Sequence, residues 1–327
     1  MIGGGPSGAA TAITCARAGL AVTLIEATPF PRHRPGETLH PGIEPLLERL
    51  GVATSVSSVS FLRHRGIWVE RYGTRRFQPY GADERGPWLG FQACRAEFDE
   101  LLLAKARSAG VTVYQPHRAL CLMRDGERIA GAETTKGSIY ATFTVDASGS
   151  SSWLARQLSL RHRPASRKLI AFYGYMHGDL PARDDAPLFT FLPDGWVWTA
   201  RVRPSLYHWT RLVTTAAPLP GGWTPPEFAG LQPLGRPKGA DVTWRLLEAC
   251  AGPGYFVVGD AAAVSDPSSS HGVLRAIMSG MLAGHLVVKR ATQYAQEPSL
   301  AGEYQQFIHS WFEFDRNRGA SQFSSLT

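Results

Sequence analysis

The chain begins with a glycine-rich loop that strongly constrains its fold. Residues 3–8 read Gly-Gly-Gly-Pro-Ser-Gly, the pattern G-x-G-x-x-G, and a later apolar run ends on the acidic residue Glu26. In a β-α-β unit, Gly3 allows the tight turn from strand to helix and Gly5 lets backbone approach a pyrophosphate. Gly8 lets the helix pack closely on the strand. The pattern predicts a dinucleotide site at a helix N-terminus, with Glu26 accepting hydrogen bonds from ribose hydroxyls.

The residues around this loop fit the same unit. Residues 9–18 favour a helix with small side chains on one face, Gly19 ends it, and a β-branched strand follows. Only Met1 and Ile2 precede the loop, whereas a strand usually has about five or six residues. Either the first strand is short or residues upstream of Met1 are missing.

Composition narrows the class of protein. The 327 residues are 44% hydrophobic and 19% charged, which is typical of a globular chain with an ample core. The net charge of +7 comes mostly from scattered arginines, and it suits an anionic ligand or an acidic partner. The sequence contains no nucleic-acid-binding motif. The apolar stretch 272–288 contains Arg275 and His285 and is short for a membrane span, so we expect a buried helix.

The cysteines give no sign of a metal site. Cys15, Cys94, Cys121 and Cys250 are widely spaced and form no C-x-x-C pair. Neither zinc nor a redox disulfide is therefore predicted, and reduced core thiols in a cytoplasmic protein fit best.

The order of predicted elements divides the chain into two kinds of segment. Helical spacing occurs at 41–50, 95–109, 271–290 and 299–314, whereas alternating and aromatic-rich stretches predict strands between them. We expect a discontinuous nucleotide-binding domain of residues 1–60, 93–165 and 249–290, an inserted sheet domain of residues 61–92 and 166–248, and a helical segment at 291–327. Binding clefts favour such domain interfaces.

Two later motifs resemble a known family of flavoproteins. Gly259 and Asp260 follow a short apolar strand, and residues 266–272 read Asp-Pro-Ser-Ser-Ser-His-Gly before a predicted helix. With the first loop, they resemble the FAD-binding set of the p-hydroxybenzoate-hydroxylase-like flavoproteins. The resemblance implies that the Gly-Asp pair holds the flavin ribityl chain and that the later helix begins near the pyrimidine edge of the flavin. A helix N-terminus there would stabilise the negative charge of reduced flavin.

The resemblance implies FAD rather than NAD as cofactor. It also implies an α/β fold, with a Rossmann-like FAD-binding domain, an inserted and mostly antiparallel β-sheet substrate domain, and C-terminal helices. Arg95 resembles the family's arginine near the FAD phosphates, while a surface ion pair with Asp99 is an alternative. The residues expected to bind FAD are Gly3, Gly5, Pro6, Ser7, Gly8, Glu26, Arg34, Arg95, Gly259, Asp260, Pro267, Ser270, Gly272 and Val273.

Several segments are typical of the tryptophan-halogenase-like and geranylgeranyl-reductase-like branches. Residues 145–149 read Val-Asp-Ala-Ser-Gly and residues 36–39 read Gly-Glu-Thr-Leu. Tryptophan halogenases carry W-x-W-x-I-P, and Trp196 and Trp198 match its tryptophans although the isoleucine and proline are absent. They also carry a lysine shortly before a Gly-Ile pair, and His64 stands at that position.

The missing lysine argues against halogenation, because neither histidine nor arginine is an obvious replacement for the amine that delivers the oxidant. The sequence therefore predicts an FAD-dependent monooxygenase that hydroxylates an indole- or phenol-like ring through a flavin C4a-hydroperoxide. A more specific hypothesis, from resemblance to the flavoproteins that mature tryptophylquinone enzymes, is hydroxylation of a tryptophan in a partner protein. A flavin-dependent halogenase and a geranylgeranyl-reductase-like reductase are the alternatives, beside a flavoprotein without catalysis.

Histidines and tryptophans are the candidates for the reaction site. A histidine can donate a proton to a peroxide or accept one from a ring, and the candidate histidines are His271, His64 and His40. The candidates to wall the substrate cavity are Trp196, Trp198 and Trp209, for which packing is the alternative role. No second nucleotide motif is present, so electrons come from transient NAD(P)H docking or from a separate flavin reductase. Ser148, in place of the aspartate of NAD(P)H-dependent hydroxylases, favours the reductase.

Overall fold

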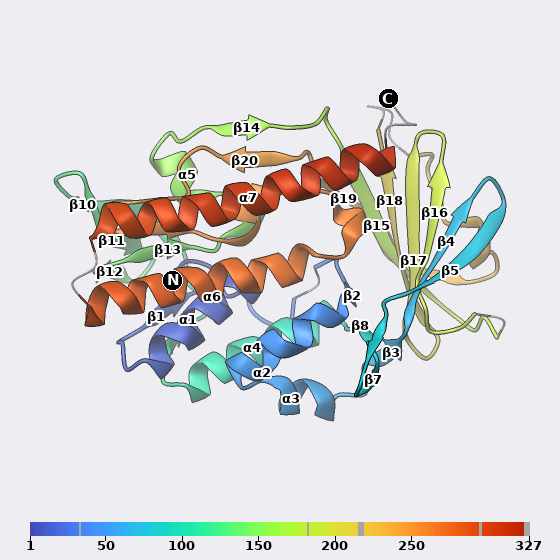
Figure 1. The fold of residues 1–327 in the computed structure, drawn as a ribbon, viewed down its shortest axis with the longest axis horizontal. Coiled ribbons are helices and arrows are strands. Elements are labelled where there is room, and N and C mark those ends of the chain that lie inside the picture. Colours follow the sequence, from blue (N-terminus) through green and yellow to red (C-terminus); the bar gives the residue numbers. More distant parts are fainter. Residues whose placement is uncertain (33, 182, 215–218, 294–295, 324–327) are drawn as a thin grey trace.

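The computed structural model describes residues 1–32, 34–181, 183–214, 219–293 and 296–323, and has a helix-rich part beside a sheet-rich part (Figure 1). The helices are α1 (Pro6–Arg17), α2 (Glu44–Leu50), α3 (Ala53–Ser58), α4 (Arg95–Ser108), α5 (Trp153–Gln157), α6 (Gly272–Thr292) and α7 (Glu297–Phe323). The strands of the helix-rich part are β1 (Thr23–Ile25), β9 (Thr112–Tyr114), β10 (Ala119–Asp125), β11 (Arg128–Thr134), β12 (Gly137–Tyr140), β13 (Thr144–Asp146), β14 (His162–Pro164), β20 (Arg245–Leu247), β21 (Ala251–Gly252), β22 (Tyr255–Val257) and β23 (Ala263–Val264).

A parallel sheet lies at the centre of the helix-rich part. Strand β1 pairs in parallel with β9, and β13 pairs in parallel with β22. Ile2 joins the two pairs, because it bridges Ile25 on one side and Asp146 on the other. The first strand is thus reduced to this bridge, and the order β9, β1, Ile2, β13, β22 is that of a Rossmann-like sheet.

The second part is built around one seven-stranded sheet. The strands outside the nucleotide fold are β2 (Thr38–Leu39), β3 (Leu62–His64), β4 (Gly66–Arg71), β5 (Thr74–Pro79), β6 (Ala82–Asp83), β7 (Gly86–Pro87), β8 (Gly90–Gln92), β15 (Ile170–His177), β16 (Leu188–Leu192), β17 (Gly195–Arg203), β18 (Leu206–Val213) and β19 (Gln232–Asp241). Strands from both inserted segments share the order β19-β15-β18-β17-β16-β4-β5, antiparallel except where β4 meets β16. The predicted fold class is confirmed.

Helices α1 and α6 cross at very close range on the parallel sheet. A Cβ atom on Gly280 of α6 would lie 2.2 Å from the carbonyl oxygen of Ser7 in α1, and one on Gly284 would lie 2.8 Å from Thr14 Cβ. Helix α6 is the described helix long and apolar enough to cross a membrane, but 56% of that stretch is buried inside the protein. It is a core helix, as its sequence predicted.

Some local predictions differ from the structure. The helix predicted at 41–50 begins with a 3-10 turn, Pro41–Ile43, before α2, and the last helix runs to Phe323 rather than to 314. All four cysteines are free, but only Cys15 and Cys250 are core residues, because Cys94 is half-buried and Cys121 is exposed on β10. Burial raises the pKa of Cys15 and Cys250 to about 12.

Candidate functional site

The first glycine loop has the backbone geometry that its sequence requires. Gly3 has a φ of +105°, and a Cβ atom there would lie 2.4 Å from the carbonyl oxygen of Ala147. A Cβ atom on Gly8 would lie 2.0 Å from the carbonyl oxygen of Gly3, so both positions demand glycine. Around Gly5, by contrast, the end of the Arg32 side chain is the neighbour within 4 Å. Helix α1 has no side-chain cap, so its first N–H groups are available to an anion.

The first two predicted motifs and the helix that follows the third meet at Ser7. Gly259 has a φ of +61°, and a Cβ atom there would lie 2.8 Å from the Ser7 hydroxyl, while Gly280 approaches the Ser7 carbonyl from α6. The Gly259 N–H also donates to the Ser279 hydroxyl at 3.0 Å. The phosphate loop, the Gly-Asp turn and the helix after the third motif therefore pack as one unit. Segments far apart in sequence together build one cradle for a dinucleotide.

Asp260 follows Gly259 at the edge of this cradle. Its side chain is exposed, yet surrounding groups desolvate it and raise its pKa, while Arg95 and Arg245 act in the opposite direction. An exposed carboxylate can accept hydrogen bonds from ligand hydroxyls. The exposed Asp260, the uncapped α1 and the room at Gly5 fit an extended dinucleotide such as FAD.

Glu26 is more constrained than the sequence predicted. Its carboxylate accepts hydrogen bonds from the Gly4 N–H at 2.7 Å and the Thr28 N–H at 2.9 Å, so it also holds the loop in place. Sequence reasoning missed Arg32, whose Nη2 lies 3.8 Å from Oε2 of Glu26 and 4.0 Å from Oδ2 of Asp99. Its buried Nε has no partner among the described residues, so Arg32 is a candidate phosphate ligand. The predicted Arg34 is exposed nearby.

Arg95 forms the pair with Asp99, but the pair is buried rather than on the surface. Its Nε and Nη2 donate to the two carboxylate oxygens of Asp99 at 2.9 and 3.0 Å, and Nη1 donates to the Pro35 carbonyl at 2.9 Å. Arg95 thereby ties α4 to the loop before β2. Contact of Arg95 with FAD remains a prediction, as do the other FAD contacts predicted from the sequence.

A buried network anchors that same loop to the large sheet. The Tyr175 hydroxyl donates to Oε1 of Glu37, and Nδ1 of His208 lies 3.4 Å from Oε2. Glu37 also accepts the Gly36 N–H at 2.9 Å. Burial lowers the pKa of His208 and raises that of Tyr175. The network couples the loop beside the nucleotide cradle to β15 and β18.

The third motif forms a corner before α6. Asp266 accepts hydrogen bonds from the backbone N–H of Ser268 at 3.0 Å and from its hydroxyl, and Ser270 adopts a left-handed backbone with φ of 55°. Burial raises the pKa of Asp266 to about 6. Gly272 is exposed and α6 has no side-chain cap, so its N-terminus can face a negatively charged ligand edge.

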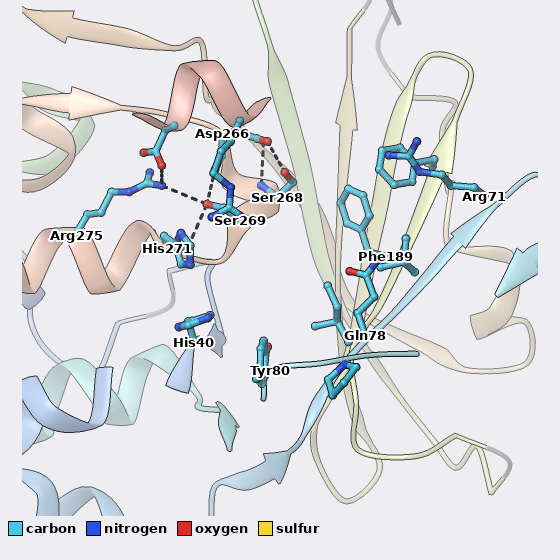
Figure 2. A pocket seen from close by; sticks show the side chains of 16 residues that line it. His40, Arg71, Gln78, Tyr80, Phe189, Asp266, Ser268, Ser269, His271 and Arg275 are labelled. Atoms are coloured by element: carbon cyan, nitrogen blue, oxygen red, sulfur yellow. Dashed lines mark hydrogen bonds and ion pairs between the residues drawn. The ribbon is translucent and has the colours of Figure 1, made fainter. Parts of the chain in front are cut away.

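A cavity of about 380 Å³ lies between this corner and the large sheet (Figure 2). Asp266, Ser269 and His271 lie on the corner side, and Phe189 and Arg71 lie across from them on the sheet side. The lining residues are His40, Ile67, Val69, Arg71, Gln78, Pro79, Tyr80, Phe189, Phe191, Asp266, Ser268, Ser269, His271, Arg275, Asp315 and Arg318. The cavity suits an aromatic ligand that would lie beside a flavin ring at the α6 corner.

The three candidate histidines take different positions. The ring centroids of His40 and His271 lie 4.8 Å apart, and both residues line the cavity. Burial lowers the pKa of His271 to about 3, assisted by Arg275, and burial also lowers the pKa of His40. A lowered pKa favours the neutral form of both imidazoles. His40 Nδ1 accepts the Gly42 N–H at 3.1 Å, which leaves the ring hydrogen on Nε2.

His64 does not line the cavity. It is only 3% exposed, its Nδ1 lies 2.9 Å from the Gly66 carbonyl oxygen, and burial lowers its pKa to about 4. Its ring lies 5.5 Å from that of Tyr80, which does line the cavity. Tyr80 in turn lies 5.2 Å from His40, so a row of rings connects His64 to the corner.

The predicted tryptophans lie outside the cavity lining. Trp196 and Trp198 belong to the main hydrophobic core behind Phe189, at ring distances of 5.3 and 5.8 Å from it. Trp198 Nε1 also donates to the Thr38 hydroxyl at 3.0 Å. Trp209 packs in a separate cluster, 5.2 Å from Trp223. The packing alternative holds in this structure because β17 is central in its sheet and residues 195–200 of it are buried.

Among the described residues, no cluster of three or more histidine, cysteine or acidic side chains could hold a metal ion. The cavity residues that sequence reasoning missed are chiefly Tyr80, Phe189, Phe191 and Arg71. The alternation of apolar and polar residues along β4 and β16 was the sequence signal for these cavity residues. It does not reveal which strand faces the α6 corner.

Comparison with known proteins identifies the family. A family model described as an FAD binding domain matches residues 1–185, more than half of the chain. The chain belongs to this family of FAD-binding proteins. Tryptophan 2-halogenase of Chondromyces crocatus is 32% identical over 314 residues, which cover 86% of this chain and 59% of that protein.

Two further proteins resemble nearly the whole chain. Digeranylgeranylglycerophospholipid reductase of Thermoplasma volcanium is 26% identical, over 96% of this chain and 83% of that protein. The structure of the myxobacterial chondrochloren halogenase CndH matches with a TM-score of 0.85 and 25% identity, over 96% of this chain and 80% of that one. The predicted FAD cofactor is confirmed by the family match, and the proteins that this chain resembles are two halogenases and a reductase. The chain spans about three fifths of the length of the tryptophan 2-halogenase.

Proposed function

We propose that this chain binds FAD and halogenates an electron-rich aromatic ring, such as an indole or a phenol, in the cavity between α6 and β4. The observation that carries the proposal is the cavity itself, which joins the FAD corner to an aromatic wall. Bound FAD, once reduced, supplies the electrons that activate O₂. The similarity to tryptophan 2-halogenase supports halogenation over the hydroxylation that the sequence predicted.

The chain's own residues orient the ring and handle its proton. Phe189 and Phe191 offer apolar faces, and the uncapped N-terminus of α6 favours negative charge at the corner. Aromatic substitution releases a proton, which the neutral imidazole of His271 can accept. His40 has its hydrogen on Nε2 and can donate to an oxygen in the cavity.

Hydroxylation is the second candidate, and one observation favours it. The sequence has five lysines, Lys105, Lys136, Lys168, Lys238 and Lys289, and none lines the cavity. A site without an amine lacks the group that holds the halogenating oxidant in the resembled enzymes. This candidate includes a tryptophan of a partner protein as substrate, for which the net charge of +7 would favour an acidic partner. A separate flavin reductase is the proposed electron source for either reaction.

Product analysis distinguishes these reactions. The FAD-loaded protein is reduced by an added flavin reductase and NADH, then given tryptophan, sodium bromide and ¹⁸O₂, and the products are measured by mass spectrometry. Bromotryptophan supports halogenation, whereas an ¹⁸O-labelled hydroxytryptophan overturns it in favour of hydroxylation. A matched assay with a geranylgeranyl lipid and no O₂ detects the reductase activity. The charged lining of the cavity argues against that activity.

A further inference from the structure

The charged residues of the cavity indicate a substrate feature beyond the aromatic ring. The charged groups in the lining are Asp266, Asp315, Arg71, Arg275 and Arg318. Asp315 pairs with Arg275, and Asp266 accepts hydrogen bonds from Ser268. Both carboxylates are therefore engaged by neighbours. Arg71, in contrast, forms no ion pair with any described residue, although it lines the cavity.

Arg71 lies at the end of the cavity away from the histidines. Ile67, Val69 and Arg71 alternate along β4 and share the face that lines the cavity. The strand rises about 13 Å over these four residue steps. The Tyr80 N–H bonds to the Arg65 carbonyl at the opposite end of β4, and the Tyr80 ring contacts His40. The cavity thus has a histidine end and an arginine end.

Phe191 orients the Arg71 side chain. The guanidinium carbon lies 3.6 Å from the centroid of the Phe191 ring, so the planar group stacks on an apolar wall. Stacking restricts the side chain while leaving its N–H donors to face a ligand. Figure 2 shows Arg71 on the sheet side of the cavity, across from His271 and the α6 corner.

We propose that the cavity takes an aromatic substrate that carries a carboxylate, and that Arg71 binds this carboxylate. The aromatic ring lies at the histidine end and a short side chain extends along β4 to the guanidinium. Arginine matches a carboxylate with two parallel hydrogen bonds, which fixes orientation as well as affinity. The inference rests on the proposed function, because the reacting ring has to lie beside the α6 corner.

Binding to the FAD-loaded protein tests the proposal without turnover. The probes are indole-3-propionate and its uncharged amide, measured by isothermal titration calorimetry. We expect the wild-type protein to bind the acid about tenfold to a hundredfold more tightly than the amide, since hydrogen bonds to charged groups have that effect. Arg71→Leu and Arg71→Gln should remove the preference. Arg124→Leu is the matched control, because Arg124 is an exposed residue of β10, lies outside the cavity lining and carries the same charge.

The outcomes distinguish a failure of the Arg71 proposal from a failure of the proposed aromatic cavity. Equal binding of acid and amide by the wild-type protein would overturn the Arg71 proposal and leave the aromatic cavity supported. Equal losses of acid binding in Arg71→Leu and Arg124→Leu would also overturn it, because the net charge of the protein would then explain the preference. Binding of neither probe would count against the aromatic cavity as well. Unchanged FAD absorbance and melting temperature show that each variant is folded.

Discussion

Two glycine-to-alanine substitutions in helices should have opposite effects on stability, because Gly280 lies in the close crossing of α1 and α6 and Gly302 does not. At Gly280, the added Cβ would lie 2.2 Å from the Ser7 carbonyl oxygen and 3.0 Å from Thr11 Oγ1. The first of these atoms is backbone, so the contact can be relieved only if the helices separate. At Gly302 in α7, an added Cβ meets nothing within 4 Å.

The magnitudes follow from two competing terms. Overpacking a core contact costs about 1–3 kcal/mol, and a backbone clash belongs at the upper end of that range. Alanine regains about 1 kcal/mol of helix propensity relative to glycine. Gly280→Ala should therefore lose about 2 kcal/mol, whereas Gly302→Ala should gain up to about 1 kcal/mol.

Thermal unfolding of the FAD-loaded proteins is the assay. We expect Gly280→Ala to lower the melting temperature by about 4 °C or more and Gly302→Ala to raise it slightly. Because Gly280 touches the phosphate loop at Ser7, Gly280→Ala should also lose flavin absorbance during gel filtration. If Gly280→Ala were as stable and as yellow as the wild-type protein, the helices would not cross as closely as described and the reasoning would fail.

Three further predictions concern the cofactor and pH. Gly5→Val should abolish FAD retention, because its side chain would occupy the space for the pyrophosphate; normal flavin absorbance would contradict this. Arg32→Leu should raise the Kd of FAD about tenfold by fluorescence titration, through loss of a charged hydrogen bond, and an unchanged Kd would exclude Arg32 as a ligand. Burial lowers the pKa of His64 from its usual 6.5 to about 4 in the folded protein, so the unfolded state binds the proton at higher pH and stability falls as pH drops from 6.5 toward 4. The melting temperature of His64→Asn should fall less over that range; parallel curves would refute this.

Local sequence determined the nucleotide cradle in advance. Gly3, Gly8 and Gly259 occupy positions where a positive φ or a contact below 3 Å admits no side chain, and such constraints are visible as a glycine pattern. The alternation of apolar residues predicted the inserted sheet in the same way. In the sequence, His40 follows the Gly-Glu-Thr-Leu segment and His271 belongs to the third motif. The structure brings these two histidines together at one cavity.

The walls of the cavity depended on which segments meet. Aromatic content suggested Trp196, Trp198 and Trp209, but the sheet turns Phe189 and Phe191 toward the corner and buries the tryptophans behind them or elsewhere. Nothing in residues 188–192 alone reports that β16 lies beside β4.

The sequence alone predicted a dinucleotide-binding fold, because backbone conformation and residue period are local properties that neighbouring residues fix. Only the tertiary structure decided that Arg32 approaches the phosphate loop, that His64 is withdrawn from the cavity, and that Arg71 faces it without an ion-pair partner among the described residues. These features depend on contacts between strands and loops distant in the chain. Their free energy comes from packing that no single segment encodes.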